Sequence, residues 1–286
     1  MQKYQAEVFI RQQHLLAEGP FWHADSGILS WVDIFAGQLI ESRDGQIIHT
    51  WPLGQYAGAA IPTDDGQYIA ALATGIYVFS PQSGLRKISQ PPLMSENHRF
   101  NDAACDPAGR FWAGTMRLFS SGQHDPDSRL YRLGEDGRCA IMREGIGVSN
   151  GMGWSPDKAT FYYADTPTRK IDVYDYDPED GSLKGLRDSI AVDGMPDGMT
   201  VDAAGRLWIA LWGSGAVIGC DPITHEVFAR IEVPTPLSSS CTFGGSDLKT
   251  LYITTAKTDG DPMSGLIYQV QLPQAGLPGR RCHLSL

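Results

Sequence analysis

The chain has 286 residues, of which 42% are hydrophobic and 20% are charged. This composition is typical of a globular protein with a full apolar core, and it argues against a disordered or collagen-like chain. Asp and Glu number 33 against 23 Lys and Arg, which gives a net charge of −10 at pH 7. Because nucleic-acid affinity rests mainly on Lys and Arg, the charge excludes a nucleic acid as the expected partner and favours small molecules or metal ions.

The cysteines and the N-terminus bear on the compartment. The five cysteines are an odd number without a CxxC pair, so neither a disulfide framework nor a thiolate zinc site is expected. Residues 1–13 lack the long apolar core of a signal peptide. No stretch approaches the roughly 20 apolar residues that a membrane span needs. We therefore expect a cytoplasmic protein without a membrane partner.

A strand, a turn and a second strand recur six times along the chain. The clearest copies are residues 101–115, 150–166 and 197–212. In chain order, the aligned turns fall at Ser26, Gly66, Gly109, Lys158, Gly205 and Leu248. Eight residues before these turns lie Glu18, Gly58, Asn101, Asn150, Asp197 and Ser240.

The period of the repeat indicates the architecture. It averages about 48 residues, contains only strands and turns, and shows no helical periodicity over a dozen residues. This pattern predicts an all-β fold, a six-bladed β-propeller with four-stranded blades around a central channel, as a single domain over residues 1–286. To close the ring, we expect residues 4–10 to pair beside residues 265–272 in one composite blade, which removes two exposed sheet edges.

Equivalent positions in the blades of a propeller lie at equivalent heights around its axis. Four of the six repeat positions carry side-chain oxygens, on Glu18, Asn101, Asn150 and Asp197. Carboxylate and amide oxygens suit a hard divalent cation such as calcium, magnesium or manganese, with zinc possible. Two alternatives stay open: these residues line a wet channel that binds nothing, or the Asn150-Gly151 and Asp197-Gly198 pairs are hairpin turns.

Five motifs occur in fixed order along the chain. They are EGP at Glu18, RFNDAACDPAGRFWAGTM from Arg99, SNGMGWSPD from Ser149, PDGMTVDAAGRLWIA from Pro196 and CTFGG from Cys241. Together they resemble the SMP-30/gluconolactonase family, which includes regucalcin and bacterial sugar lactonases. The resemblance implies a six-bladed propeller that binds one divalent cation through Glu18, Asn150 and Asp197. It also implies that Arg99 and Asn101 contact the substrate.

Such a site has a natural chemistry. A divalent cation with open positions polarises a carbonyl and lowers the pKa of water, so a sugar lactone held there is opened to the aldonic acid. Asp197 is the candidate general base, and Arg99 can donate to substrate hydroxyls or to an anionic group. The alternatives are an esterase or phosphotriesterase of the same fold, and a calcium-binding or scaffolding protein without turnover.

The sequence departs from the animal branch of the family after Met116. Where regucalcin-like proteins continue with acidic residues, this chain has Arg117, Leu118 and Phe119. Arg117 either favours an anionic substrate or lies solvated on a loop, and His98 is either a substrate contact or an exposed loop residue. The oligomeric state, monomer or small homo-oligomer, stays open.

Other residues have mainly structural interpretations. Phe21, Trp22 and Trp212 are candidates to cover a sugar face, although core packing is the commoner role of aromatic residues. Asp33 and Asp165 lie fifteen residues after Glu18 and Asn150 in their repeats. For these two carboxylates, structural hydrogen bonding is a sufficient role.

Overall fold

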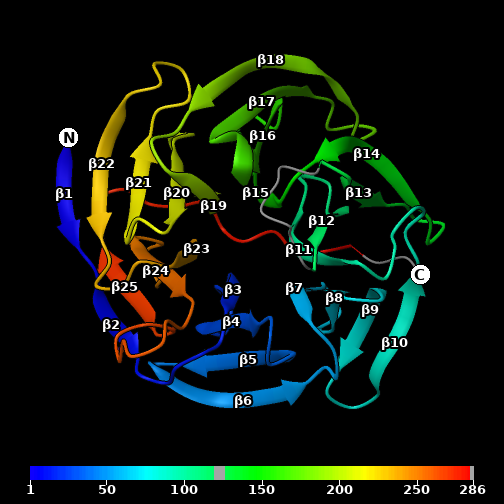
Figure 1. The fold of residues 1–286 in the computed structure, drawn as a ribbon, viewed down its shortest axis with the longest axis horizontal. Helices are drawn as coiled ribbons and strands as arrows, with labels where there is room; N and C mark the ends of the chain where they lie inside the picture. The colour runs from blue at the N-terminus through cyan, green and yellow to red at the C-terminus, as the bar shows by residue number, and fades with distance from the viewer. Residues whose placement is uncertain (119–125, 284–286) are drawn as a thin grey trace.

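The computed structural model of the protein describes residues 1–118 and 126–283. In this part of the chain the regular structure consists of 25 strands and one 3-10 turn, η1 (Thr166–Thr168). The strands form six sheets arranged in a ring about a central axis (Figure 1). The predicted six-bladed β-propeller is confirmed. No helix in the described residues is long and apolar enough to span a membrane.

Five blades each contain four consecutive strands, of which the first is innermost, and the sixth contains three consecutive strands and β2. The first blade contains β3 (Ala17–His23), β4 (Ile28–Asp33), β5 (Gln38–Arg43) and β6 (Gln46–Pro52). The second contains β7 (Ala57–Pro62), β8 (Tyr68–Leu72), β9 (Gly75–Ser80) and β10 (Gly84–Ser89). The third contains β11 (His98–Cys105), β12 (Phe111–Arg117), β13 (Ser128–Leu133) and β14 (Cys139–Ile146). The fourth blade contains β15 (Ser149–Trp154), β16 (Thr160–Asp165), β17 (Lys170–Tyr176) and β18 (Leu183–Ala191). The fifth contains β19 (Met195–Val201), β20 (Leu207–Trp212), β21 (Ala216–Cys220) and β22 (Val227–Glu232). The three consecutive strands of the sixth are β23 (Ser238–Gly244), β24 (Thr250–Thr255) and β25 (Ile267–Gln271).

The N-terminal residues join two blades. β2 (Glu7–Ile10) pairs antiparallel with β25, as expected for the composite sixth blade. β1 (Gln2–Gln5) instead pairs in parallel with β22 of the fifth blade, so Tyr4 lies beside Ile231 and not beside residues 265–272. The chain crosses between the blades at the buried Ala6, whose amide donates to the Glu232 carbonyl at 2.9 Å. This segment therefore covers the outer edges of two sheets, where one was expected.

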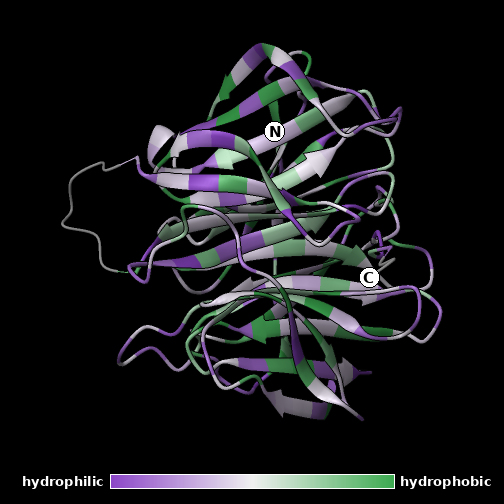
Figure 2. Ribbon diagram, turned by 90° about the vertical axis from the view of Figure 1, so that its right-hand side faces the viewer, coloured by the Kyte–Doolittle hydropathy of each residue, from purple (hydrophilic) through white to green (hydrophobic). Residues whose placement is uncertain are grey.

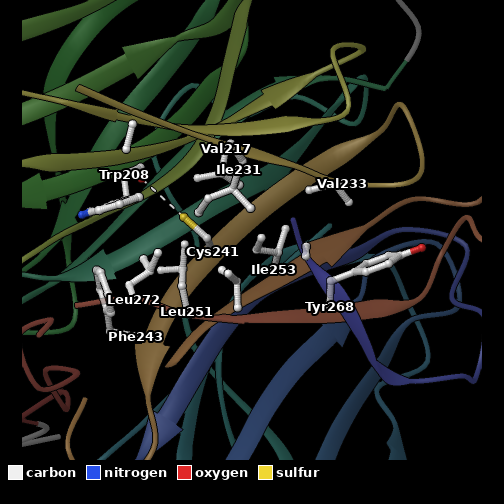
Figure 3. Close-up of a cluster of buried hydrophobic side chains, with 14 of the residues drawn as sticks. Trp208, Val217, Ile231, Val233, Cys241, Phe243, Leu251, Ile253, Tyr268 and Leu272 are labelled. Atoms are coloured by element: carbon white, nitrogen blue, oxygen red, sulfur yellow. Dashed lines mark hydrogen bonds between the residues drawn. The ribbon is translucent and has the colours of Figure 1, made fainter. Parts of the chain in front are cut away.

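Apolar side chains from facing sheets fill the space between blades. Between the fifth and sixth blades, Trp208 and Val217 meet Cys241 and Leu251 in one buried cluster (Figure 3). The Cys241 thiol donates to the Trp208 carbonyl at 3.3 Å across this contact. Seen from the side, the strands contain both hydrophobic and hydrophilic residues (Figure 2). This mixture is expected of sheets in which some side chains are buried and others face solvent.

The turns between the first two strands of each blade follow the repeat. Five of the six aligned turn positions have a positive φ, at Gly66, Gly109, Lys158, Gly205 and Leu248. In the first copy the left-handed residue is Gly27, one position after Ser26. Because glycine adopts this conformation without steric cost, the glycine spacing in the sequence reports the position of these turns.

Each aligned turn lies at the same end of the ring. We call this the far end, and we call the opposite end, where the innermost strands begin, the mouth. The C-terminal residues 272–283 cross the far end, as the red trace in Figure 1 shows. They are attached to three blades by the amides of Gly276, Cys282 and His283, which donate to the carbonyls of Leu248, Pro62 and Gly109 at 2.7, 2.9 and 2.9 Å.

A buried aspartate holds two of the far-end turns. Asp106 has no exposed surface and accepts hydrogen bonds from Arg110, Trp112 and Tyr176 at 2.6, 3.0 and 2.7 Å. Burial opposes its ionisation, but these donors outweigh burial and lower its pKa. Asp202 repeats the arrangement in the fifth blade with its own Arg and Trp partners. The repeated D-x-x-G-R-x-W pattern is therefore structural.

We predict that Asp106→Ala lowers the free energy of unfolding by about 3 kcal/mol, because it leaves a buried indole, a buried phenol and a partly buried guanidinium without their acceptor. Asp136→Ala, in an exposed turn, should change it by less than about 0.5 kcal/mol. Urea denaturation of both variants measures the difference. Equal stabilities would contradict the structural role of Asp106.

Candidate functional site

Every innermost strand has an irregular register at the repeat position. The pairing with the second strand of each blade shifts between Glu18/Phe21, Ala57/Ala59, Phe100/Asp102, Ser149/Met152, Pro196/Met199 and Ser238/Ser240. Bulges of this kind bend a strand and change the direction of a side chain. The positions aligned from the sequence thus coincide with, or directly adjoin, the six places where the strands depart from regular pairing around the axis.

The innermost strands approach one another closely at the same height. A Cβ atom added to Gly58 would lie 2.6 Å from the Phe100 carbonyl oxygen, and one added to Gly151 would lie 2.6 Å from the Asp197 carbonyl oxygen. A Cβ on Gly198 would collide with Ser240. Glycine at these positions lets six strands surround a narrow axis, which brings residues far apart in the sequence into one small volume.

Two carboxyl groups are buried in this volume. Glu18 is 4% exposed and Asp197 is 5% exposed. Burial, followed by the charges of Asp197 and Asp102, raises the pKa of Glu18 well above its ordinary range. Burial and the charge of Asp102 likewise raise the pKa of Asp197, which the Asn150 amide and Arg99 lower by less. Negative charge is therefore concentrated here with insufficient compensation from the protein.

Asp102 is a third buried acid, and the sequence analysis did not single it out. Burial raises its pKa from 3.8 to about 6. It lines a cavity of about 150 Å³ on the far side of the repeat positions, together with Met199, Cys241 and residues 277–280. Its position directly after Asn101 in the N-D pair is the signal that could have identified it.

The Asn150 side chain is oriented by a relay of two hydrogen bonds. Its Nδ2 donates to Thr166 Oγ1 at 2.9 Å, and the Thr166 hydroxyl donates to the Pro196 carbonyl at 2.7 Å. The relay fixes which end of the amide is oxygen, and this buried Oδ1 has no hydrogen-bond partner among the described residues. A buried acceptor without a donor requires a ligand or water. Thr166 was not predicted because it lies outside the aligned position.

The Arg99 and Asn101 side chains are hydrogen-bonded to each other, and Arg99 lies close to Glu18 and Asp197. Arg99 is 4% exposed, and burial lowers its pKa to about 10 against the opposing effects of Glu18 and Asp197. Its Nη1 donates to Asn101 Oδ1 at 2.7 Å, while Asn101 Nδ2 donates to the Ser149 carbonyl at 2.9 Å. The structure thus brings Arg99 to the acids, but both ends of the Asn101 amide are engaged within the protein.

His98 and Arg117 converge on an acid that the sequence analysis did not name. His98 Nε2 lies 3.0 Å from Asp127 Oδ1, and Arg117 makes two contacts with the same carboxylate at 2.9 and 2.5 Å. Both residues lie at the mouth end, on β11 and β12. His98 is buried, contrary to the interpretation as an exposed loop residue. Phe119, the third residue of the divergent segment, lies outside the described residues.

The structure corrects part of the aromatic prediction. Phe21 packs at the far end, where its ring leaves no room for a Cβ on Gly279, and Trp22 stacks on Tyr252 with ring centroids 5.5 Å apart. Both follow Glu18 along β3 and so lie farther from the mouth than Glu18 does. Trp212, at the mouth end of β20, is half-buried and forms a bridge to Leu237.

Asp33 and Asp165 have the structural role predicted for them. Asp33 accepts from the amides of Leu15 and Leu16 at 2.8 and 3.2 Å, and Asp165 accepts from the Val148 amide at 2.9 Å. These bonds hold the chain that enters β3 and β15, and therefore support Glu18 and Asn150 from behind.

The donor set suits a hard cation. The described residues contain no cluster of three or more His, Cys, Asp or Glu side chains that could hold a metal ion by themselves. Glu18 and Asp197 supply two buried carboxylates, and Asn150 supplies the unpartnered Oδ1. Oxygen ligands with two negative charges are those preferred by calcium, magnesium and manganese. The residues fit a divalent cation.

Comparison with known proteins identifies the family. A family model described as SMP-30/Gluconolactonase/LRE-like region matches residues 16–257. The chain therefore belongs to the SMP-30/gluconolactonase family, as the resemblance of its motifs implied.

Relatives of known name cover nearly the whole chain. It is 39% identical to pentonolactonase XacC of Haloferax volcanii, over 87% of this chain and 84% of that protein. It is 34% identical to 6-deoxy-6-sulfogluconolactonase of Pseudomonas putida, over 93% and 94%. A crystal structure of regucalcin from Agrobacterium tumefaciens, described as a calcium-binding protein, aligns with a TM-score of 0.89 and 25% identity over 99% of both chains.

We predict that Thr166→Val weakens Mn²⁺ binding about tenfold, because Asn150 loses the acceptor that orients its amide. Thr166→Ser keeps the hydroxyl and should bind within about twofold of the parent. Isothermal titration of the chelated proteins with Mn²⁺ measures both affinities. Equal affinity of the Val and Ser variants would exclude the relay as an orienting device.

The raised pKa values predict a pH-dependent stability. An acid whose pKa is higher in the folded state holds a proton that the unfolded chain has released, so stability falls as pH rises. For Asp102 this loss spans the range from 3.8 to about 6. The chelated protein should therefore melt at a lower temperature at pH 8 than at pH 5. Glu18→Gln should reduce this difference, and thermal melts that leave it unchanged would contradict the charge accumulation.

Proposed function

We propose that the protein is a divalent-metal-dependent lactonase that opens a sugar lactone to its aldonic acid. The observation that carries the proposal is the convergence of Glu18, Asp197 and the unpartnered Oδ1 of Asn150 at the axis, with Arg99 beside them. The lactonase names of relatives at 34% and 39% identity support the reaction class.

Glu18, Asn150 and Asp197 would hold the cation. When bound, a divalent cation polarises the lactone carbonyl and lowers the pKa of a water molecule beside it. It would also offset the negative charge that raises the pKa values of Glu18 and Asp197, and so keep Asp197 ionised near neutral pH. Asn150 adds a ligand without adding charge. The metal ion itself, whether Ca²⁺, Mn²⁺, Mg²⁺ or Zn²⁺, stays open because oxygen donors accept several.

Asp197 acts as the general base. Its carboxylate takes a proton from the attacking water, and the new C–O bond forms at the lactone carbonyl carbon. When the ring C–O bond breaks, the leaving oxygen receives that proton and becomes a hydroxyl. This transfer returns Asp197 to its ionised form, and the product is the ring-opened acid.

Arg99 positions the lactone. Its two hydrogen bonds to described residues are both donated by Nη1, to the Phe100 carbonyl and to Asn101 Oδ1. Nε and Nη2 therefore keep donors for hydroxyl groups of the substrate. Asn101 contributes by fixing this guanidinium.

In this proposal His98 and Arg117 also contact the substrate, at the mouth end of the site. Both are held by Asp127, which offsets the positive charge of Arg117. An uncharged sugar lactone therefore suits this side better than an anionic one.

The test is a pH-stat assay of aldonolactones with the chelated protein and with each divalent ion restored. Acid release should require the metal, and Asp197→Asn should lower kcat by about 100-fold or more while keeping the fold. Glu41→Gln, at a buried carboxylate outside the site, is the matched control and should retain activity.

Three outcomes would overturn the proposal. Faster turnover of aryl esters or organophosphates than of any lactone would indicate an esterase or phosphotriesterase. Tight calcium binding without turnover would indicate a binding protein. Near-normal activity of Asp197→Asn would remove Asp197 as the base.

A further inference from the structure

Two aromatic side chains lie exposed at the mouth. Phe35 is in the turn between β4 and β5, and Tyr56 directly precedes β7, which places both at the end where the innermost strands begin. They are the most exposed aromatic residues in the described part of the chain, at 47% and 42%. Their rings contact each other edge to face, with centroids 5.6 Å apart and planes at 75°. Neighbouring exposed rings are a feature of binding surfaces.

The pair is connected to the acids through Arg99. The Arg99 Cζ lies over the Phe35 ring, 5.7 Å from its centroid, and the same guanidinium is close enough to Glu18 and Asp197 for their charges to affect it. Aromatic rings, guanidinium and carboxylates therefore follow one another from the mouth inward. Arg99 is more than nine-tenths buried, and its Nε and Nη2 make no hydrogen bond to a described residue. Neither nitrogen is among the fully buried polar atoms that lack a partner, so both reach solvent, where a ligand can take the place of water.

The backbone that carries the rings is firmly attached. The Ile34 carbonyl accepts from the amides of Gly37 and Ala57 at 3.2 and 3.3 Å, which joins the Phe35 turn to the chain at Tyr56. The Tyr56 carbonyl in turn accepts from the Ala73 amide at 2.9 Å. The backbone at both residues is thus held by one hydrogen bond within the Phe35 turn and by two that join it to neighbouring segments.

We propose that Phe35 and Tyr56 form an aromatic subsite that contacts the C–H face of a cyclic sugar lactone while Arg99 binds its hydroxyls. This inference rests on the proposed function and adds the feature of the substrate that is recognised. A sugar ring has a face of C–H groups with partial positive charge, which suits the negative face of an aromatic ring. Rigid rings beside a few directed donors are the usual composition of a small-molecule site.

The test separates binding from chemistry. With the Mn²⁺-saturated protein and D-glucono-1,5-lactone, Phe35→Ala and Tyr56→Ala should each raise KM about tenfold, the equivalent of about 1.4 kcal/mol, and change kcat less than about threefold. Phe35→Tyr keeps a ring and should stay within about twofold of the parent. Ile223→Ala removes an exposed apolar side chain at the far end and should change neither constant.

A binding measurement supplies a readout that does not depend on turnover. Titration with 1,5-anhydro-D-glucitol, which has the sugar ring but no carbonyl, should show a Kd raised about tenfold in both alanine variants. Unchanged KM and Kd in these variants, with an active parent, would overturn the aromatic subsite alone. A parent protein that hydrolyses no aldonolactone and does not bind the anhydro sugar would overturn the subsite and the proposed function together.

Exposed aromatic rings can also form a contact between two copies of a chain. Sedimentation velocity of the same variants tests whether Phe35 and Tyr56 do so. If Phe35→Ala or Tyr56→Ala converts a larger assembly into a smaller one, the rings join copies of the chain, and the subsite is wrong. A sedimentation coefficient equal to that of the parent supports the subsite.

Discussion

Burial of like charges at the propeller axis is the constraint on which the candidate site depends. Glu18, Asp197 and Asp102 are all withdrawn from water, and each has a raised pKa. Arg99 supplies one positive charge to Glu18 and Asp197. Such an arrangement is unfavourable for the protein alone and becomes favourable when a cation or protons are added. Groups that lower the stability of the folded protein in this way are common at functional sites.

The fold makes this concentration possible through its narrowest part. Gly58, Gly151 and Gly198 allow neighbouring innermost strands to approach until a side chain no longer fits between them. The irregular pairing at the same height frees the next residues to turn toward the axis. The blades outside this level are ordinary packed sheets. The same architecture can therefore serve different chemistries by changing a few residues at one level and in the links around the mouth.

The repeat explains what the sequence could predict. Glycine turns and aromatic strands recur at a regular period, so the six blades and the six axial positions followed from alignment of the chain with itself. Asn101 was predicted to resemble the other axial oxygens, yet its amide is used by Arg99 and Ser149. That outcome depends on side-chain partners from a different blade, which a periodic pattern does not encode.

Apart from Asp102, which directly follows an aligned position, the features that the sequence analysis missed lie outside the repeated part of each blade. Thr166, Asp127, Phe35 and Tyr56 are in links between strands, where length and composition differ from blade to blade. Their partners lie in other links or strands of the ring, and only the closed ring brings them together. The roles of Glu18, Asn150, Asp197 and Arg99 followed from motif resemblance and stay predictions, although the structure brings their side chains to one place.

The double attachment of the N-terminal segment has a consequence for how the molecule assembles. β1 and β2 pair with β22 and β25, which are synthesised more than 200 residues later. β1 and β2 therefore emerge from the ribosome before their partner strands exist. The ring can close only after nearly the whole chain has been synthesised. Contacts of such long sequence separation slow folding.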